Sequence, residues 1–454
     1  MKAVQVVKRD GQVEQFSPEK IERVMRAAGM NEEQSKLLVA SIVSWISALH
    51  IESITSLKIR DAVLDEMVAL EQILNHFDRE KYAVTVHTTT NTLSHTNILS
   101  HNEQIGHVTV RRYTSPHNIF IPRVPYASAH SVIMTNFTLM PHIWVLVQVA
   151  FKKVTRTKRF GFYIFPCGGF TPNWKSMPRL QRAIKKFIHI AIGAPLIAYT
   201  ADSVIAISSW EKRELSKNHI PAHAITVIPL GVEDEAFKPI DTPVSSPIIE
   251  LVKTHRPYVV QVSRIHPIKN IKTTIQALAQ MNSLLSYIIV GAVEDENHLR
   301  ELQDLINKLN LSNRVIFAGK LTTQEKYFVI DNSLCMVHMS YNESFGLSVY
   351  EGMSRGKICI AAHNSALEEA IKEEHNGYLF ATTDSAGLAS KLTELLSPNS
   401  SAVRRRIEQT NKGEMQRFTW ANTANTLQKL IGMFIMVLPL STIDWGYVAI
   451  AVTS

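Results

Sequence analysis

The sequence predicts an α/β protein with two doubly wound parallel sheets behind a small α+β module. Apolar strand-like segments alternate with helical segments from about residue 81 to residue 430, a pattern typical of parallel sheets. Residues 229–257, which are rich in proline, serine and acidic residues, divide this alternation into two parts. A chain of 454 residues is also too long for one core, so we expect several domains.

Residues 1–64 are the first expected domain. Residues 3–7 and 12–16 are predicted as two short strands, because the Asp10-Gly11 pair between them favours a tight hairpin turn. The helices expected after this hairpin cover about 18–28, 32–49 and 56–74, the last one capped by Ser56. This domain is therefore a β-hairpin followed by helices.

Residues 65–228 and 229–430 are the two domains that would hold the parallel sheets. In the first of them, strands are expected at 81–90, 130–137, 159–166 and 202–208, with helices near 138–154 and 178–199. In the second, strands are expected at 256–263, 286–291, 313–319, 333–340 and 357–362, with helices between most of them.

Residues 431–454 form a mostly apolar tail. Pro439 and Asp444 interrupt the apolar run, and a charge near the middle of a membrane span is costly. The sequence leaves open both a single membrane anchor and a buried terminal segment.

Composition bounds the cellular setting and the partners. The three cysteines are scattered, which favours a reducing compartment and argues against a disulfide framework or a zinc site. No signal peptide is visible, so we expect a cytoplasmic protein. The net charge of +8 suits phosphate-bearing ligands, an anionic membrane face or nucleic acid, and does not decide between them.

Two cations follow the first strand of the second sheet. Arg264 and Lys269 lie in the segment VSRIHPIKN, directly after a strand, where ligands of open α/β sheets bind. There they would present a bidentate fork and a point charge to a diphosphate. Two surface cations on a loop are the alternative interpretation.

A second motif follows the fourth strand of this sheet, in NESFGLSVYEGMSRG. Glu343 precedes the predicted helix and Glu351 lies about two turns inside it. A carboxylate suits sugar or ribose hydroxyls because it accepts two hydrogen bonds at once. Gly346 and Leu347 would supply backbone N–H groups to an anion at the start of the helix.

These segments, together with HNGYLF at 375–380, resemble the C-terminal domain of the retaining GT-B glycosyltransferases of family 4, also called group 1. The resemblance covers about 130–430. It implies a GT-B fold of two Rossmann-like domains and a nucleoside diphosphate (NDP) sugar as donor. It also implies the following roles: Arg264 and Lys269 bind the donor pyrophosphate, Glu343 contacts the donor sugar as the catalytic residue, Glu351 binds the ribose, and the backbone of Phe345, Gly346 and Leu347 completes the phosphate cradle.

The first sheet departs from the family in two places. The loop FPCGGFTPNW resembles the family's acceptor-side loop, but Cys167 stands before Gly168 and Gly169 where the family usually has a histidine that lines the reaction centre. The family's opening strand and its glycine-rich turn are also missing before the helix at 66–77. We therefore expect an incomplete first sheet, with consequences for turnover, unless another segment compensates.

The segment VVKRDGQVEQFSPEKI resembles the opening of the ATP-cone, a regulatory nucleotide-binding domain. By position, the resemblance implies that Lys8, Arg9 and Lys20 face the phosphates of ATP or dATP and that Ser56 lies nearby. A small basic cap on an enzyme is the alternative.

The sequence thus predicts a retaining glycosyltransferase of the hexosyltransferase class. It would use an NDP-sugar without a metal or a tightly bound cofactor, and ATP or dATP as an effector. The acceptor would be a glycan or a lipid-linked molecule, with peripheral contact to the inner membrane face left open and no nucleic acid partner. The alternative is an impaired, nucleotide-sensing protein in which the ATP-cone is the working part, and a gene fusion with neither half complete is a third reading. The cysteine pattern disfavours a ribonucleotide reductase and a zinc-ribbon repressor.

Overall fold

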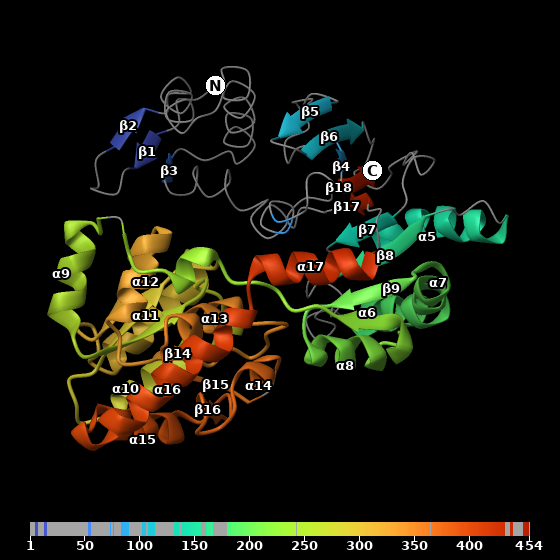
Figure 1. The fold of residues 1–454 in the computed structure, drawn as a ribbon. Coiled ribbons are helices and arrows are strands. Elements are labelled where there is room, and N and C mark those ends of the chain that lie inside the picture. The colour runs from blue at the N-terminus through green and yellow to red at the C-terminus, as the bar shows by residue number, and fades with distance from the viewer. Residues whose placement is uncertain are drawn as a thin grey trace. The chain divides into compact units, whose positions relative to one another are not determined.

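The computed structural model divides into two compact units (Figure 1). Unit 1 comprises Met1–Ala206, Glu214–Thr226 and Ala424–Ser454, and unit 2 comprises Ile207–Arg213 and Val227–Thr423. The structure describes residues 5–7, 13–15, 53–55, 73, 76, 83–89, 102–105, 108–113, 131–135, 139–155, 160–166, 179–241, 243–363, 365–431, 436–438 and 448–453.

A small three-stranded sheet opens the chain. Strands β1 (Gln5–Val7) and β2 (Val13–Gln15) are antiparallel, which confirms the predicted hairpin. Strand β3 (Ser53–Thr55) pairs parallel to β1 and was not predicted. Its β-branched Ile54 and Thr55 favour a strand, which ends directly before Ser56, where we placed the start of a helix. The helices predicted for this domain lie outside the described residues.

The second sheet of unit 1 has nine strands. Its order is β10 (Ile225–Val227), β9 (Ser203–Ala206), β8 (Gly161–Phe165), β7 (Ser131–Thr135), β17 (Met436–Leu438), β18 (Val448–Thr453), β4 (Ala83–Thr89), β6 (Val108–Tyr113) and β5 (Asn102–Ile105). The strands predicted at 81–90, 130–137, 159–166 and 202–208 are confirmed as β4, β7, β8 and β9. The other five were not predicted as strands.

The apolar tail supplies the two strands in the middle of this sheet. Strand β17 pairs parallel to β7, and β18 pairs antiparallel to both β17 and β4. The backbone groups on the facing edges of β7 and β4, which a missing strand would leave unpaired, therefore have partners from the end of the chain. Among the helices that the structure describes, none combines the length and apolar composition that a membrane crossing requires.

Several helices of unit 1 follow strand β7. Helix α5 (Leu139–Val154) is followed by α6 (Arg179–Ile188), a π-helical turn η3 (His189–Gly193) and α7 (Ala194–Thr200). The helices predicted at 138–154 and 178–199 are thus confirmed, the second with a π-helical interruption. Helices α8 (Ser209–Lys217) and α17 (Trp420–Ile431) each have their first residues in unit 2 and their last residues in unit 1.

Unit 2 is built on a parallel six-stranded sheet. Its order is β13 (Val315–Gly319), β12 (Ser286–Val290), β11 (Tyr258–Val262), β14 (Met336–His338), β15 (Cys359–Ala362) and β16 (Gly377–Phe380). All five strands predicted here are confirmed, and β16 is formed by the last four residues of the HNGYLF segment. The helices are α9 (Ser246–His255), α10 (Ile271–Ala279), α11 (Glu296–Lys308), α12 (Thr323–Asp331), α13 (Leu347–Ser354), α14 (Leu367–Ala370), α15 (Ser385–Leu396) and α16 (Ser401–Glu414).

The strand order places a topological switch point between β11 and β14. From β11 the chain moves to β12 on one side, while β14 pairs with β11 on the other. The loops after β11 and β14 therefore leave the sheet side by side and in opposite directions. In open α/β sheets a ligand crevice forms at this point, outside the carboxyl ends of the strands.

Candidate functional site

Asn270 joins the two loops that leave the switch point. It ends the 3₁₀ turn η6 (Pro267–Lys269) in the left-handed conformation, with φ of 48°. Its side-chain Nδ2 donates to the backbone oxygens of Met339, at 2.9 Å, and Thr382, at 2.8 Å. The backbone N–H of Tyr341 also donates to the oxygen of Ile268, at 2.8 Å. The Lys269 loop and the Glu343 loop are thus fixed to each other.

Three donors converge on one oxygen of Glu343. Lys269 Nζ lies 2.6 Å from Oε1, His338 Nε2 lies 2.7 Å from it, and Ser340 Oγ lies 2.8 Å from it. The structure therefore brings together two of the residues that the sequence singled out, Lys269 and Glu343.

This environment lowers the pKa of Glu343 to about 2. Burial alone would raise the pKa, but the hydrogen bond from His338 and the charges of His338 and Lys269 outweigh it. The carboxylate is therefore ionised at neutral pH, and it can accept hydrogen bonds from a ligand but cannot donate one.

The backbone at Phe345, Gly346 and Leu347 forms the start of helix α13. Gly346 is its N-cap and has φ of 84°, a conformation that favours glycine. A Cβ atom at this position would lie 2.2 Å from Cδ2 of Leu367. The Phe345 ring stacks on Tyr350, with 4.2 Å between centroids. The turn is thus fixed by packing, with backbone N–H groups at the start of a helix.

Glu351 lies on α13 and contacts helix α12. Lys326 Nζ is 2.6 Å from its Oε1, and the Tyr327 hydroxyl is 3.5 Å from the same atom. Burial raises the pKa of the nearby Glu233. The positive charge of Lys326 lowers this pKa, and the negative charge of Glu351 raises it. Lys326 therefore interacts favourably with two carboxylates, those of Glu351 and Glu233.

Arg264 has a different environment from Lys269. Its guanidinium pairs with Glu294, and 63% of its side chain is exposed. Of the four predicted charged residues, Lys269 and Glu343 contact each other, whereas Arg264 and Glu351 each have another partner.

Several residues of the site had no strong signal in the sequence. His338 and Ser340 end the apolar segment SLCMVHMS, where polar residues at the carboxyl end of a buried strand were a usable clue. Lys326 and Tyr327 come from a helix without a motif of its own, so only the fold reveals them.

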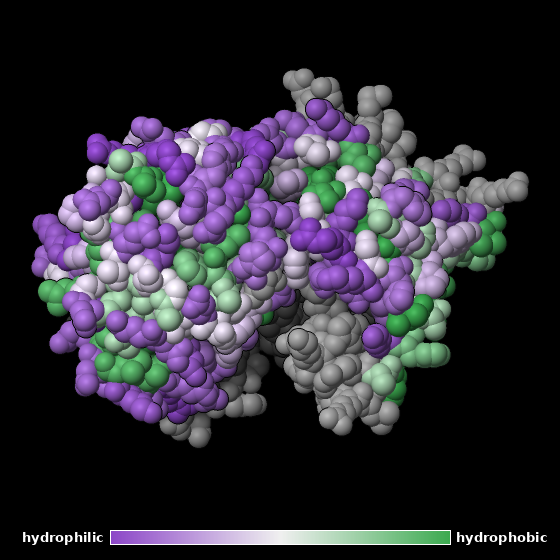
Figure 2. All heavy atoms as spheres, turned by 90° about the horizontal axis from the view of Figure 1, so that it is seen from below, coloured by the Kyte–Doolittle hydropathy of each residue, from purple (hydrophilic) through white to green (hydrophobic). Residues whose placement is uncertain are grey.

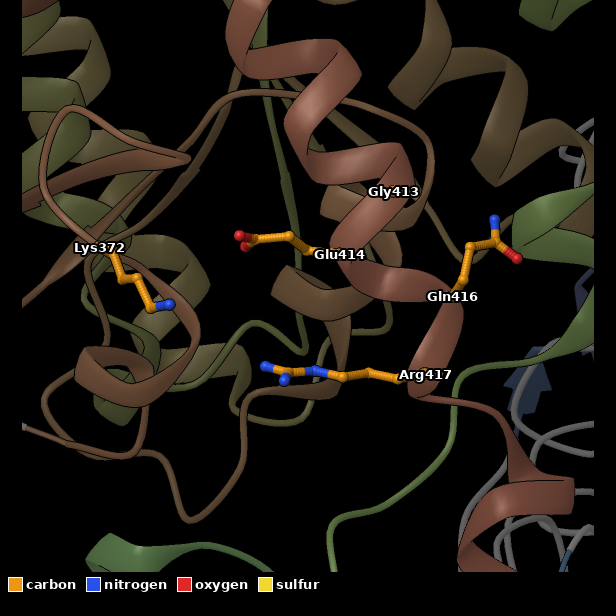
Figure 3. A pocket seen from close by; sticks show the side chains of 5 residues that line it. All are labelled: Lys372, Gly413, Glu414, Gln416 and Arg417. Carbon is orange, nitrogen blue, oxygen red and sulfur yellow. The ribbon is translucent and has the colours of Figure 1, made fainter.

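A separate hollow of about 410 Å³ lies elsewhere on unit 2 (Figure 3). It is lined by Lys372, Gly413, Glu414, Gln416 and Arg417. Figure 3 shows Lys372 and Arg417 reaching into one space beside Glu414. His375 Nε2 and Asn376 Nδ2 contact Glu414, at 2.8 Å and 3.2 Å. None of the predicted donor-site residues lines this hollow.

Comparison with known families decides the class of unit 2. The model of the group 1 glycosyl transferases matches residues 247–414, which contain the switch point and all four charged residues. The C-terminal part of the chain is a group 1 glycosyltransferase domain. The model of the ATP cone domain matches residues 4–85, so the chain also carries an ATP-cone domain at its N-terminus.

Curated relatives align with parts of this chain. It is 35% identical over 89 residues to the α-1,3/1,6-mannosyltransferase ALG2 of Dictyostelium discoideum. This alignment covers 20% of this chain and 21% of that protein. It is 26% identical over 246 residues to the D-inositol 3-phosphate glycosyltransferase of Stackebrandtia nassauensis. This alignment covers 52% of this chain and 55% of that protein. The chain therefore spans about half the length, or less, of these two relatives.

Solved structures share the fold. HepE from Anabaena in complex with UDP has a TM-score of 0.54 at 20% identity, over 66% of this chain and 78% of that one. Sucrose-phosphate synthase from Thermosynechococcus elongatus has a TM-score of 0.56 at 20% identity, over 75% of this chain and 86% of that one. The chain has the parallel-sheet α/β fold of the GT-B glycosyltransferases.

The remaining predicted site residues fall outside the part of the chain that the structure describes. They are Lys8, Arg9, Lys20 and Ser56 of the ATP-cone domain, and Cys167, Gly168 and Gly169 of the acceptor-side loop. Their roles remain predictions.

Proposed function

We propose that this protein is a retaining glycosyltransferase that moves a hexosyl group from an NDP-sugar to a glycan or a lipid-linked acceptor. The observation that carries the proposal is the contact between Lys269 and Glu343 at the switch point of a group 1 glycosyltransferase domain. It supports the proposal because a cation suits a leaving diphosphate and a carboxylate suits sugar hydroxyls.

In the proposed reaction, the bond between the sugar C1 and the phosphate oxygen breaks while the acceptor oxygen bonds to C1 from the same face. Lys269 and Arg264 offset the negative charge that develops on the leaving diphosphate. The backbone N–H groups at Gly346 and Leu347 add to this stabilisation. The acceptor's proton passes to the departing phosphate oxygen. Glu343 accepts hydrogen bonds from sugar hydroxyls, and Glu351 accepts them from the ribose.

The names of similar proteins support the ligand classes. HepE is described in complex with UDP and with UDP-glucose. One relative in Dictyostelium discoideum, 25% identical over 39% of this chain, is the GDP-Man:Man(3)GlcNAc(2)-PP-Dol α-1,2-mannosyltransferase. A nucleotide-sugar donor without a tightly bound cofactor, and a glycan or lipid-linked acceptor, extend these descriptions to this chain.

A donor-hydrolysis assay tests the proposal without knowledge of the acceptor. The purified full chain is incubated with UDP- and GDP-hexoses, and release of the nucleoside diphosphate is measured. We expect slow hydrolysis of at least one donor, and a loss of about a hundredfold in Glu343→Gln. Identical rates for the two proteins, above the buffer blank, would contradict the proposed role of Glu343.

We also propose that unit 1 contacts an anionic lipid surface, which would bring the protein to the inner membrane face. Helices α5, α6 and α7 all contact the turn η3. Phe151 on α5 is 67% exposed and Phe187 on α6 is 71% exposed. Further exposed apolar residues on these elements are Val147, Val154, Ile184, Ile190, Ile192 and Tyr199. Figure 2 shows such hydrophobic side chains among hydrophilic ones on the surface of this unit.

The neighbouring charges fit this assignment. Lys153 and Lys186 are exposed on the same helices, and Lys153 Nζ lies 4.9 Å from the centre of the Tyr199 ring. Apolar side chains rimmed by lysines are typical of surfaces that bind anionic lipids. We expect the full chain to sediment with vesicles that contain phosphatidylglycerol, and the double variant F151S/F187S to stay in the supernatant. Equal sedimentation of both proteins would contradict the assignment.

The ATP-cone domain favours a second function, that of a nucleotide sensor. The match over residues 4–85 is the observation that supports it. In this reading ATP or dATP binds through Lys8, Arg9 and Lys20, and the transferase domain does not turn over. ATP titration of the full chain and of Lys20→Ala tests the site. The sensor function requires ATP binding that Lys20→Ala removes, together with no hydrolysis of any sugar nucleotide.

A further inference from the structure

His338 is a buried residue at the site to which neither the sequence motifs nor the proposed reaction gives a role. It is the last residue of β14 and is 1% exposed. Its Nε2 lies 2.7 Å from Oε1 of Glu343, and the Oγ of Ser340 lies 3.2 Å from the same nitrogen. Because an ionised carboxylate only accepts hydrogen bonds, Nε2 carries the hydrogen.

The other ring nitrogen has no such contact. Within the described part of the chain, His338 Nδ1 is buried and has no hydrogen-bond partner. Burying a polar atom without a partner is unfavourable, so the burial of this ring calls for an explanation. Among the described residues, the hydrogen bonds of the ring are those with Glu343 and Ser340.

The contacts of Glu343 are asymmetric. Lys269, His338 and Ser340 all bond to Oε1, and among the described residues no hydrogen bond reaches Oε2. The carboxylate is therefore held by one oxygen and presents the other. The Glu343 side chain is 12% exposed, and because Oε1 already accepts three hydrogen bonds, Oε2 has more capacity to accept one from a ligand.

We propose that His338, with Ser340, is a positioning residue that holds Glu343 so that Oε2 faces the donor sugar. This inference rests on the proposed function. Lys269 alone cannot perform the task, because in the proposed reaction it also binds the donor diphosphate. When Lys269 turns to the diphosphate, His338 and Ser340 keep Glu343 in place. Because they contact the carboxylate and not the nucleotide, they affect the reaction of the sugar and leave the binding of the nucleotide unchanged.

A kinetic comparison separates this role from a structural one. Donor hydrolysis and UDP or GDP affinity are measured for the full chain, His338→Leu, His338→Gln and Ser340→Ala. We expect His338→Leu to lower kcat by about ten- to a hundredfold while the nucleotide affinity stays within about twofold. His338→Gln should recover much of this loss, because its amide N–H donates from nearly the same place as Nε2. Ser340→Ala should show a smaller loss than His338→Leu.

The matched control is His375→Leu. His375 also contacts a glutamate, with 2.8 Å between Nε2 and Oε1 of Glu414, but 47% of its side chain is exposed and it lies outside the donor site. We expect unchanged kinetics for this variant. The proposal is overturned if His338→Leu keeps the full kcat, if it loses nucleotide affinity as strongly as kcat, or if His338→Gln is no better than His338→Leu.

A thermal double-mutant cycle keeps this inference distinct from the proposed function. If the unaltered chain hydrolyses no sugar nucleotide, the proposed function fails, and the contact is judged from the Tm values of His338→Leu, Glu343→Gln and the double variant. A double variant with clearly less Tm loss than the sum of the two single variants supports the coupling of His338 and Glu343. Additive losses overturn it.

Discussion

Lys326 Nζ lies 2.6 Å from Oε1 of Glu351, and the two side chains are 17% and 8% exposed. The lysine also lies 4.6 Å from the centre of the Tyr327 ring. The carboxylate that we propose for the ribose is thus already paired within the protein. A ribose hydroxyl must bind the remaining oxygen or share Oε1 with the lysine.

Replacing Lys326 by methionine should destabilise the protein. The change leaves the carboxylates of Glu351 and Glu233 together without their cation, and removal of one partner of a buried ion pair costs about 3 kcal/mol. The free energy of unfolding is measured by urea denaturation. Lys217→Met is the control, because Lys217 in its pair with Glu214 is 69% exposed and should contribute less than about 1 kcal/mol. Equal losses would show that burial of the Lys326 pair is unimportant.

The low pKa of Glu343 predicts a pH dependence of stability. Because the pKa is about 2 in the folded protein and 4.5 ordinarily, ionised Glu343 contributes stability that is fully present above about pH 4.5. That contribution, on the order of 3 kcal/mol, is lost as the pH falls toward 2. The difference in unfolding free energy between the unaltered chain and Glu343→Gln should be constant from about pH 5.5 to 7, because a carboxyl with a pKa of 4.5 is almost fully ionised about one pH unit above it. It should shrink below about pH 4.5; a difference independent of pH would contradict this account.

Gly346 should not tolerate a side chain. An alanine there adds a Cβ 2.2 Å from Cδ2 of the buried Leu367 and must adopt φ of 84°. We expect Gly346→Ala to lose about 2 kcal/mol or more of stability and to bind nucleotide more weakly. Gly413→Ala is the matched control, because nothing lies within 4 Å of its added Cβ and it sits in helix α16. This control should be neutral or stabilising by up to about 1 kcal/mol, and a similar loss in both variants would refute the argument.

Asn270 should stabilise the protein both through the hydrogen bonds of its side chain and through its left-handed backbone conformation. Asn270→Ala removes the hydrogen bonds to Met339 and Thr382 and places alanine at φ of 48°. The expected loss is about 3 kcal/mol, from these two hydrogen bonds, the one that Asn270 Oδ1 accepts from Thr273, and the backbone strain. Asn310→Ala isolates the strain, because Asn310 has φ of 55° on an exposed turn, and it should cost about 1 kcal/mol. Equal losses in urea denaturation would mean that Asn270 does not hold the loops together.

The sequence predicted the sheet of unit 2 well because its strands are buried on both faces. Segments such as 286–291 and 357–362 are nearly continuous apolar runs, and the order of motifs after them pointed to the edge where ligands bind. Lys269 and Glu343 were assigned to one site through the resemblance of their motifs to a known family, and the structure brings the two side chains into contact.

Other features depend on tertiary contacts that no local pattern contains. The pairing of the tail strand β17 with β7 joins residues that are about 300 positions apart in the sequence, so the apolar run alone left a membrane anchor open beside a buried segment. Lys326 of α12 contacts Glu351 of α13 through the tertiary fold, which no local pattern around either residue indicates. Strand β3 is short, and its three residues carry too little pattern to outweigh a helix-capping serine.

Calorimetric titration of the full chain with UDP, GDP and ATP, repeated with Glu351→Ala and Arg264→Ala, tests the donor site most directly. The account predicts that UDP or GDP binds, that each substitution weakens this binding by about tenfold or more, and that ATP binding is unchanged. If neither UDP nor GDP binds while ATP does, or if Glu351→Ala binds them as tightly as the unaltered chain, the switch point of unit 2 is not a donor site.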